Sequence, residues 1–286
     1  MPPIRVEVVP PSGLLTGDAL EFLTQWEASN NVLLGYARRG DDPTMPTVFM
    51  VLQDESGKVC GAAMRTEGFP VLLAVPTSVE AALAVEAHFA DEVLCGVNGP
   101  EEASAAFHEA RAERDGASTW VAGHRMICYE ASPASLQTAA LLEDETARWL
   151  SGNNPTDLAL VKELIDDFSK AVGSRVAGDF AKRRLEQGTA KFLVLQRDDD
   201  VCALVASART TPRYAVITSV YTLPSWRRKG CARRVVSTMA TRLLEEKERV
   251  ALFADANEVG PNKLYVSLGF APVNTMQVWE PPSSLL

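Results

Sequence analysis

Residues 223–232 read LPSWRRKGCA and join a run rich in β-branched residues to a long amphipathic helix. Gly230 has no Cβ, so the backbone there can come close to a ligand. The helix that follows directs its unpaired N–H groups and the positive end of its dipole at the turn. The turn and the start of the helix hold several cations and no acid: Arg227, Arg228, Lys229, Arg233 and Arg234. The turn is therefore predicted to bind a polyanion through its phosphate groups.

Strand, basic turn and helix follow one another in the order that such a site needs. Upstream, residues 214–222 (YAVITSVYT) have the length and composition of one buried strand. Downstream, apolar residues recur at helical spacing from Ala232 to Leu244. A short apolar strand at 250–254 and a helix that stops at Gly269 come next.

Two motifs of this region resemble those of a known superfamily. The turn fits the pattern PxxRxxGxA, and residues 262–270 (NKLYVSLGF) carry LYxxxGF after an asparagine. Both resemble the acetyl-coenzyme A motifs of the GNAT superfamily of N-acetyltransferases. A plain αβ unit with a solvated basic turn explains each motif but not their order. The resemblance implies an α/β fold of the α+β kind, in which helices flank a mixed, mostly antiparallel sheet.

The chain repeats its plan of elements. In the first half a helix at 19–29 precedes β-like runs at 47–53, 58–65 and 69–75 and a helix at 79–89. Helices at 158–170 and 177–187 and strands at 191–196 and 201–208 lead to the turn in the second half. The sequence predicts two GNAT-like domains in tandem, residues 1–130 and 141–286, joined by a linker at 131–140.

The first copy lacks the residues that would bind phosphate. Residues 74–79 (AVPTSV) stand where the second copy has its turn, with no glycine and no cation. Thr77 or Ser78 is interpreted as an ordinary helix N-cap. We therefore expect a degenerate N-terminal domain and a single cofactor site, in the C-terminal domain. Elsewhere in this half, Asn30-Asn31 is predicted to end the first helix, and Asn98-Gly99-Pro100 to form a turn before the next helix.

Composition limits the possible functions. The chain has 286 residues and is 47% hydrophobic, which is enough to form folded cores. Its net charge of −9 disfavours binding to nucleic acid. Its five cysteines are scattered and odd in number, which favours reduced thiols. No apolar run is long enough to span a membrane, and no signal peptide is recognised. We expect a cytoplasmic monomer or homodimer that binds neither membrane nor nucleic acid.

The resemblance implies a role for each residue of the two motifs. The acyl donor would be acetyl-CoA, with a backbone N–H near Val220 or Tyr221 as the oxyanion donor. Tyr265 would be the catalytic acid that protonates the leaving thiolate; a packing role with a solvated hydroxyl is the alternative. The cofactor-binding residues would be Val220, Tyr221, Thr222, Arg227, Arg228, Lys229, Gly230, Cys231, Ala232, Arg233 and Asn262.

The general base is left open. Many GNAT enzymes place a glutamate on the strand before the turn, but residues 214–222 hold no acid. A water chain, a carboxylate such as Glu67, Asp255 or Glu258, or an amine that binds already neutral would each serve. The implied function is acetyl transfer to a primary amine of a small molecule or peptide, by direct attack in a ternary complex. The missing acid keeps a second class open, a non-catalytic acyl-CoA sensor or scaffold.

Metal chemistry is not expected. The three histidines, His88, His108 and His124, are scattered without HxxxH spacing or a nearby cysteine pair. They are interpreted as surface or packing residues.

Overall fold

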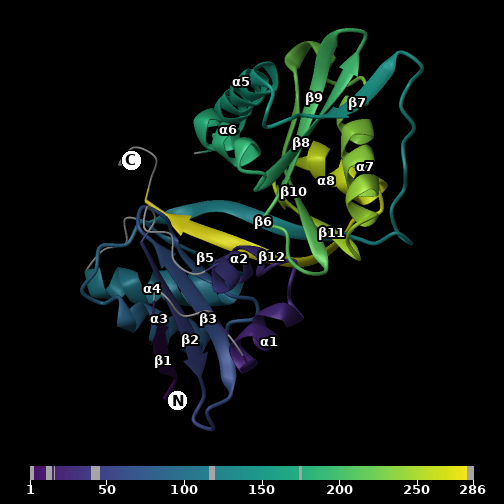
Figure 1. Ribbon diagram of the computed structural model, residues 1–286. Helices are drawn as coiled ribbons and strands as arrows, with labels where there is room; N and C mark the ends of the chain where they lie inside the picture. Colours follow the sequence, from purple (N-terminus) through teal and green to yellow (C-terminus); the bar gives the residue numbers. More distant parts are fainter. Residues whose placement is uncertain are drawn as a thin grey trace. The chain divides into compact units, whose positions relative to one another are not determined.

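The computed structural model describes residues 3–10, 15, 17–39, 46–115, 120–173 and 176–281. The chain forms two compact units (Figure 1). The first unit comprises the described residues of Met1–Cys128, Ala254–Val259 and Pro272–Leu286, and the second those of Tyr129–Phe253 and Gly260–Ala271. Each unit therefore contains segments that are distant in sequence.

The order of elements is repeated, as the sequence predicts. The first series is β1 (Arg5–Val9), α1 (Gly17–Gln25), α2 (Asn31–Arg39), β2 (Thr47–Gln53), β3 (Val59–Thr66), β4 (Val71–Leu73), α3 (Val79–His88), β5 (Val97–Pro100), α4 (Glu101–Asp115) and β6 (Val121–Ala131). The second is β7 (Glu145–Trp149), α5 (Pro155–Val172), α6 (Gly178–Glu186), β8 (Ala190–Arg197), β9 (Asp200–Ala208), β10 (Tyr214–Thr222), α7 (Cys231–Leu244), β11 (Arg249–Asp255), α8 (Val259–Ser267) and β12 (Ala271–Glu280). A short 3-10 helix, Pro224–Trp226, lies between β10 and α7.

Six strands of the first unit follow the order β1-β2-β3-β4-β5-β12, and the part of β6 within this unit lies next to β12. Among these six strands, β4 and β5 run parallel and the other neighbouring pairs are antiparallel. Successive side chains of a strand point to opposite faces, so Met50 and Leu52 of β2 enter a core with α3 and α4. Phe49 and Val51 enter the core on the other face, with α1 and α2. The helices thus cover both faces of this sheet.

The second unit has the strand order β11-β10-β9-β8-β7, with β10 and β11 parallel and the rest antiparallel. On one face α5 and α6 pack against β8 and β10, through residues such as Val161, Ile165 and Leu204. On the other face α7 packs against β8, β9 and β10 with a buried stripe that includes Val235, Met239 and Leu243. The predicted mixed, mostly antiparallel sheet flanked by helices is confirmed in both units.

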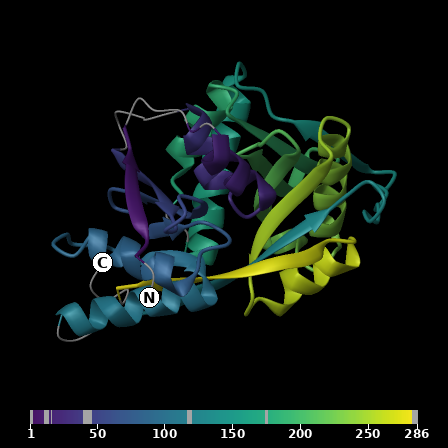
Figure 2. The same ribbon diagram turned by 90° about the horizontal axis from the view of Figure 1, so that it is seen from below.

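The last strand, β12, drawn in yellow in Figures 1 and 2, belongs to the first unit. It pairs antiparallel with β5. Gln277 lies opposite Gly99, and a Cβ on Gly99 would lie 2.7 Å from the Cβ of Leu73. The predicted turn at Asn98-Gly99-Pro100 is therefore wrong: these residues are strand β5. Pairing with a strand from the end of the chain outweighs their local preference for a turn. The domain boundaries at 130 and 141 stay a prediction about the sequence repeat.

Asn30 and Asn31 do not end the first helix. Helix α1 ends at Gln25, and Asn31 begins a second helix, α2. The prediction that both asparagines terminate α1 is wrong because their buried side chains bond to distant or neighbouring backbone, and the Asn30 carbonyl accepts the N–H of Leu34 at 2.8 Å.

Candidate functional site

The parallel strands β10 and β11 stop pairing before either strand ends. Their register runs from Tyr214 opposite Arg249 to Ile217 opposite Leu252, whereas β10 continues to Thr222. Among the described residues, the ladder between the two strands thus ends at Ile217. Beyond Ile217, the edge of β10 does not pair with β11. A ligand that carries amide groups can therefore hydrogen-bond to this edge as an added strand would.

A bulge lies in this last part of β10. The pairing with β9 shifts between Thr218 and Tyr221, and Ser219 has a φ of 47°. A bulge bends the strand and removes its extra residues from the ladder. It therefore lies at Ser219 and Val220, and Tyr221 pairs again, with Leu204. The resemblance implies an oxyanion donor at Val220 or Tyr221, at the end of this bulge. Tyr221 itself is buried, with its ring edge-on to Phe168.

The basic turn leads directly into α7. Gly230 has a φ of 79° and is the N-cap of the helix, and Arg228 also has a positive φ, 63°. The first regular helical hydrogen bond joins the Arg234 N–H to the Gly230 carbonyl at 3.2 Å. The N–H groups of Cys231, Ala232 and Arg233 lie in the first turn of the helix, where an α-helix supplies no carbonyl for them. With no acid in that turn, these groups suit an anion.

The cations of the turn have different surroundings. Arg227, Arg228 and Lys229 are exposed. The Lys229 ammonium lies 4.5 Å from the Trp226 ring centroid. Arg233 instead donates to the Ser267 hydroxyl of α8 at 2.6 Å and to its carbonyl at 3.3 Å. Arg233 therefore ties α7 to α8, in addition to any contact with a ligand.

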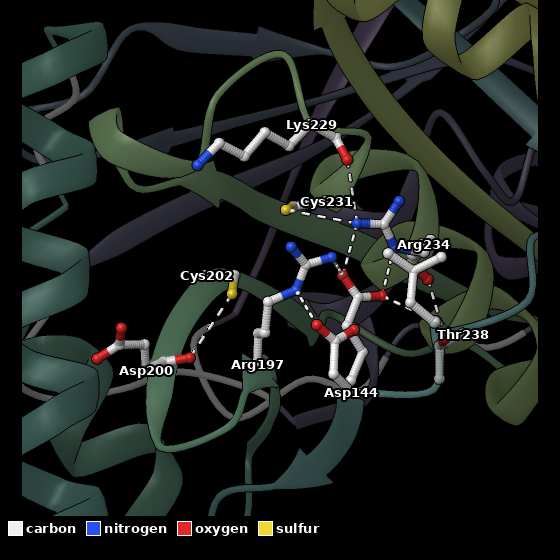
Figure 3. Close-up of polar contacts among 10 residues, drawn as sticks. Asp144, Arg197, Asp200, Cys202, Lys229, Cys231, Arg234 and Thr238 are labelled. Carbon is white, nitrogen blue, oxygen red and sulfur yellow. Dashed lines mark hydrogen bonds and ion pairs between the residues drawn. The ribbon is translucent and has the colours of Figure 1, made fainter.

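Arg234 is held inside the second unit. Figure 3 shows its guanidinium directed at the Lys229 carbonyl and the Cys231 sulfur, and the hydrogen bonds measure 3.1 and 3.7 Å. Its main partner is the carboxylate of Glu145 on β7. Sequence reasoning missed Glu145, because it lies in an acidic stretch that has the composition of a solvated loop.

Tyr265 is buried on α8, near Tyr129 and Phe270, with ring centroids 6.2 Å away in each case. Burial raises the pKa of Tyr265 to about 12, so the phenol is neutral at physiological pH. None of the described residues forms a hydrogen bond with its hydroxyl. One helical turn earlier, Asn262 accepts a hydrogen bond from the Tyr129 hydroxyl through Oδ1, at 2.9 Å.

The three carboxylates considered as the base lie in the first unit. Glu67 and Glu258 are exposed. Asp255 lies 2.6 Å from His124 Nδ1. Burial favours the neutral form of Asp255, but the hydrogen bonds with His124 and from the Asn257 N–H outweigh it and lower the Asp255 pKa. A lowered pKa makes Asp255 a weaker base, and the structure assigns the role to none of the three.

Other side chains singled out in the sequence have structural surroundings. His108 stacks on Trp279 with the ring centroids 4.2 Å apart. The part of the chain that the structure describes holds no group of three or more His, Cys, Asp or Glu arranged for a metal ion. Within the same residues, no helix is both long and apolar enough to cross a membrane.

The first unit has a different structure at the position of the turn. The Ser78 hydroxyl caps α3 by accepting the Ala81 N–H at 3.2 Å, which confirms the N-cap interpretation. The amide of Asn30, fully buried, accepts the Val75 N–H at 2.8 Å and donates to the Val75 carbonyl at 2.7 Å. The Asn30 side chain thus forms the hydrogen bonds of the Val75 backbone, shortly after β4.

Asn30→Ala is expected to lower the free energy of unfolding by about 3 kcal/mol, because it leaves a buried N–H and a buried C=O of Val75 without partners. Chemical denaturation of the full chain measures this loss. The exposed N-cap change Asn154→Ala, which removes bonds to Thr156 and Asp157, is the comparison and should cost about 1 kcal/mol. A loss for Asn30→Ala no larger than that would contradict a structural role for the Asn30 amide.

Comparison with known proteins agrees with this architecture. Residues 193–279, which include β10, the turn, α7 and α8, match the family model described as FR47-like protein. Two similar solved structures are a GCN5-related N-acetyltransferase from Kribbella flavida (16% identity, 95% of this chain and 98% of that chain, TM-score 0.57) and one from Sphaerobacter thermophilus (14%, 96% and 94%, TM-score 0.57). A tandem GNAT protein from the clavulanic acid biosynthesis pathway is also similar (14%, 96% and 98%, TM-score 0.55). No curated protein matches the sequence significantly.

The chain has the GNAT fold, as these solved structures do, and its residues 193–279 match the FR47-like model. The fold that the turn and the LYxxxGF segment predicted is confirmed, and both motifs lie within the FR47-like match at 193–279.

Proposed function

We propose that the protein is an acetyl-CoA-dependent N-acetyltransferase that acts on a primary amine of a small molecule or peptide. The observation that carries the proposal is the turn at 227–232, where Gly230 caps α7 a few residues after the part of β10 that no longer pairs with β11. The backbone of Val220, Tyr221 and Thr222 would pair with the pantetheine arm, and Asn262 would contact it. The N–H groups and cations of 227–233 would bind the pyrophosphate.

The chemistry is a direct attack. The lone pair of the neutral amine forms a bond to the thioester carbonyl carbon, and negative charge develops on the carbonyl oxygen. A backbone N–H at the β10 bulge stabilises this charge. The C–S bond then breaks, the nitrogen loses a proton, and the sulfur leaves as a thiolate that the Tyr265 hydroxyl stabilises by donating a hydrogen bond. The base that removes the proton from the amine is not assigned.

The surroundings of the cysteines agree with a cytoplasmic location, which is part of the proposal. None of the five cysteines, all of which the structure describes, is in a disulfide, and three of them, Cys128, Cys202 and Cys231, are buried. Burial raises the pKa of Cys202 to about 11, which keeps it as the unreactive thiol.

Calorimetry with acetyl-CoA, followed by thiol-release assays over a panel of amines, tests the function. We expect one acetyl-CoA bound per chain, because among the described residues only the second unit has the turn, and turnover with at least one amine. The panel includes peptide N-termini and polyamines. Binding without turnover on any amine would indicate a sensor instead of an enzyme, and absence of binding would contradict both.

A further inference from the structure

The carboxylate of Glu145, the first residue of β7, is completely buried within the second unit. It lies 2.5 Å from Arg234 Nε and also accepts Arg234 Nη2 at 2.6 Å. Arg197 Nη2 and the Leu142 N–H donate to it at 3.3 and 3.1 Å. A carboxylate so far from water persists as an ion only when its oxygens are paired in this way.

Glu145 is charged at neutral pH. Burial alone would raise its pKa, but the hydrogen bonds from Arg234 and from the Leu142 N–H, with the charges of Arg234 and Arg197, lower the pKa below the usual value. The ion pair between Glu145 and Arg234 is therefore complete under physiological conditions, and Arg234 is not available as a free cation of the turn.

Arg234, held by Glu145, also contacts the turn. Its Nη2 donates to the Lys229 carbonyl at 3.1 Å (Figure 3). A Cβ on Gly230 would lie 2.7 Å from Arg234 Nη1, so the guanidinium lies directly against the N-cap of α7. The two anchors of this side chain are thus Glu145 on one side and the turn on the other.

We propose that Glu145 is a positioning residue of the acyl-CoA site: it fixes the Arg234 guanidinium, which holds the Lys229 carbonyl and keeps the turn open for the pyrophosphate. The inference rests on the proposed function, because it needs an acyl-CoA at the turn. Glu145 does not touch the ligand, and it acts through Arg234.

Electrostatics and positioning predict opposite effects for Glu145. A carboxylate near an anion site repels the anion, so its replacement by a neutral group would strengthen binding if charge alone mattered. If Glu145 positions the turn, the same replacement weakens binding because Arg234 loses its anchor. The sign of the change therefore separates the two roles.

Glu145→Gln is expected to raise the Kd for acetyl-CoA about tenfold in calorimetry on the full chain, the size of one lost charged hydrogen bond. The KM for acetyl-CoA should rise with it, while the KM for the amine and kcat at saturating acetyl-CoA stay within about twofold. The double variant Glu145→Gln/Arg234→Gln should bind about as weakly as Arg234→Gln alone, because both changes break the same link.

Glu86→Gln is the matched control. Glu86 is also a buried glutamate, with Arg114 Nη2 at 2.8 Å and Arg111 Nη1 at 3.6 Å, but it lies in the first unit. It should lower the free energy of unfolding without changing the Kd for acetyl-CoA. If the Kd for acetyl-CoA rose only because stability was lost, it would rise in both variants. If Glu145 positions the turn, the Kd for acetyl-CoA rises only in Glu145→Gln.

Two results would overturn the inference: a Kd for acetyl-CoA in Glu145→Gln that is equal to or lower than that of the wild type, or an equal rise in Glu86→Gln. If Glu145→Gln does not fold, Arg234→Lys tests the same link, since one ammonium cannot reproduce the two-sided contact of the guanidinium. Absence of acetyl-CoA binding by the wild type would instead refute the proposed function, and this inference with it.

Discussion

Tyr265→Phe is expected to lower kcat about a hundredfold and to leave the Kd for acetyl-CoA unchanged. The substitution removes one hydroxyl and keeps the ring that packs against Phe270. The hydroxyl donates only when negative charge develops on the departing sulfur, so its loss affects the transition state and not the binding of the acyl donor. Steady-state kinetics with the best amine of the panel, together with calorimetry, measures both quantities.

The expected size follows from the pKa of Tyr265. General acids contribute about 10²- to 10⁴-fold, and the largest effects need an acid whose pKa lies near the working pH. Burial raises the pKa of Tyr265 to about 12, well above the value of about 8.5 for an ordinary thiol. Full proton transfer to the thiolate is therefore uphill, and the phenol acts mainly as a hydrogen-bond donor, at the low end of that range.

The same pKa predicts a pH dependence. The neutral phenol is the form that donates, and it persists until the pH approaches about 12. We therefore expect no fall in kcat from ionisation of Tyr265 up to about pH 10. A descending limb below pH 10 that disappears in Tyr265→Phe would show that the tyrosine ionises in the working range, contrary to this expectation.

Tyr214→Phe is the control for this variant. Tyr214 is also buried in the second unit, and its hydroxyl donates to Glu130 at 2.7 Å, at the start of β10. Its loss should lower the free energy of unfolding by about 1 kcal/mol and leave kcat unchanged. If Tyr265→Phe retained full turnover, or if both variants lost activity equally, Tyr265 would have no role in catalysis.

Gly269→Ala is expected to lower the free energy of unfolding by more than about 3 kcal/mol. Gly269 has a φ of 83°, which disfavours any side chain. In addition, a Cβ would lie 1.8 Å from the Ser135 carbonyl oxygen, and the neighbouring Gln137 N–H donates to the Leu268 carbonyl at 2.9 Å. The backbone of 135–137 would have to move away from the end of α8 to make room.

Gly188→Ala separates the two causes. Gly188 also lies in the second unit and has a φ of 65°, but nothing is within 4 Å of where its Cβ would be. Gly188→Ala should lower the free energy of unfolding only by the cost of placing a side chain at a positive φ, about 1 kcal/mol. Urea denaturation of both variants gives the difference, which measures the steric contact with Ser135. Equal losses would mean that the contact contributes nothing.

The sequence determined what is local in this protein. The turn at 227–232, the strand before it and the helix after it follow from glycine, cations and apolar spacing within residues 214–244, and the structure has all three. The LYxxxGF segment likewise forms the end of α8, where Tyr265 is buried. Such features are specified by neighbours in the chain, so a single sequence carries them.

The tertiary structure decided what joins distant residues. Asn98-Gly99-Pro100 has the composition of a turn but is a strand, because β12 at the other end of the chain supplies its hydrogen bonds. Glu145 lies 89 residues before Arg234 in the sequence. Nothing in its acidic stretch indicates that it pairs with this arginine beside the turn. The pairing of strands and the burial of charge depend on which segments meet in space. Which segments come into contact is determined by the packing of the whole chain and not by local conformational preference.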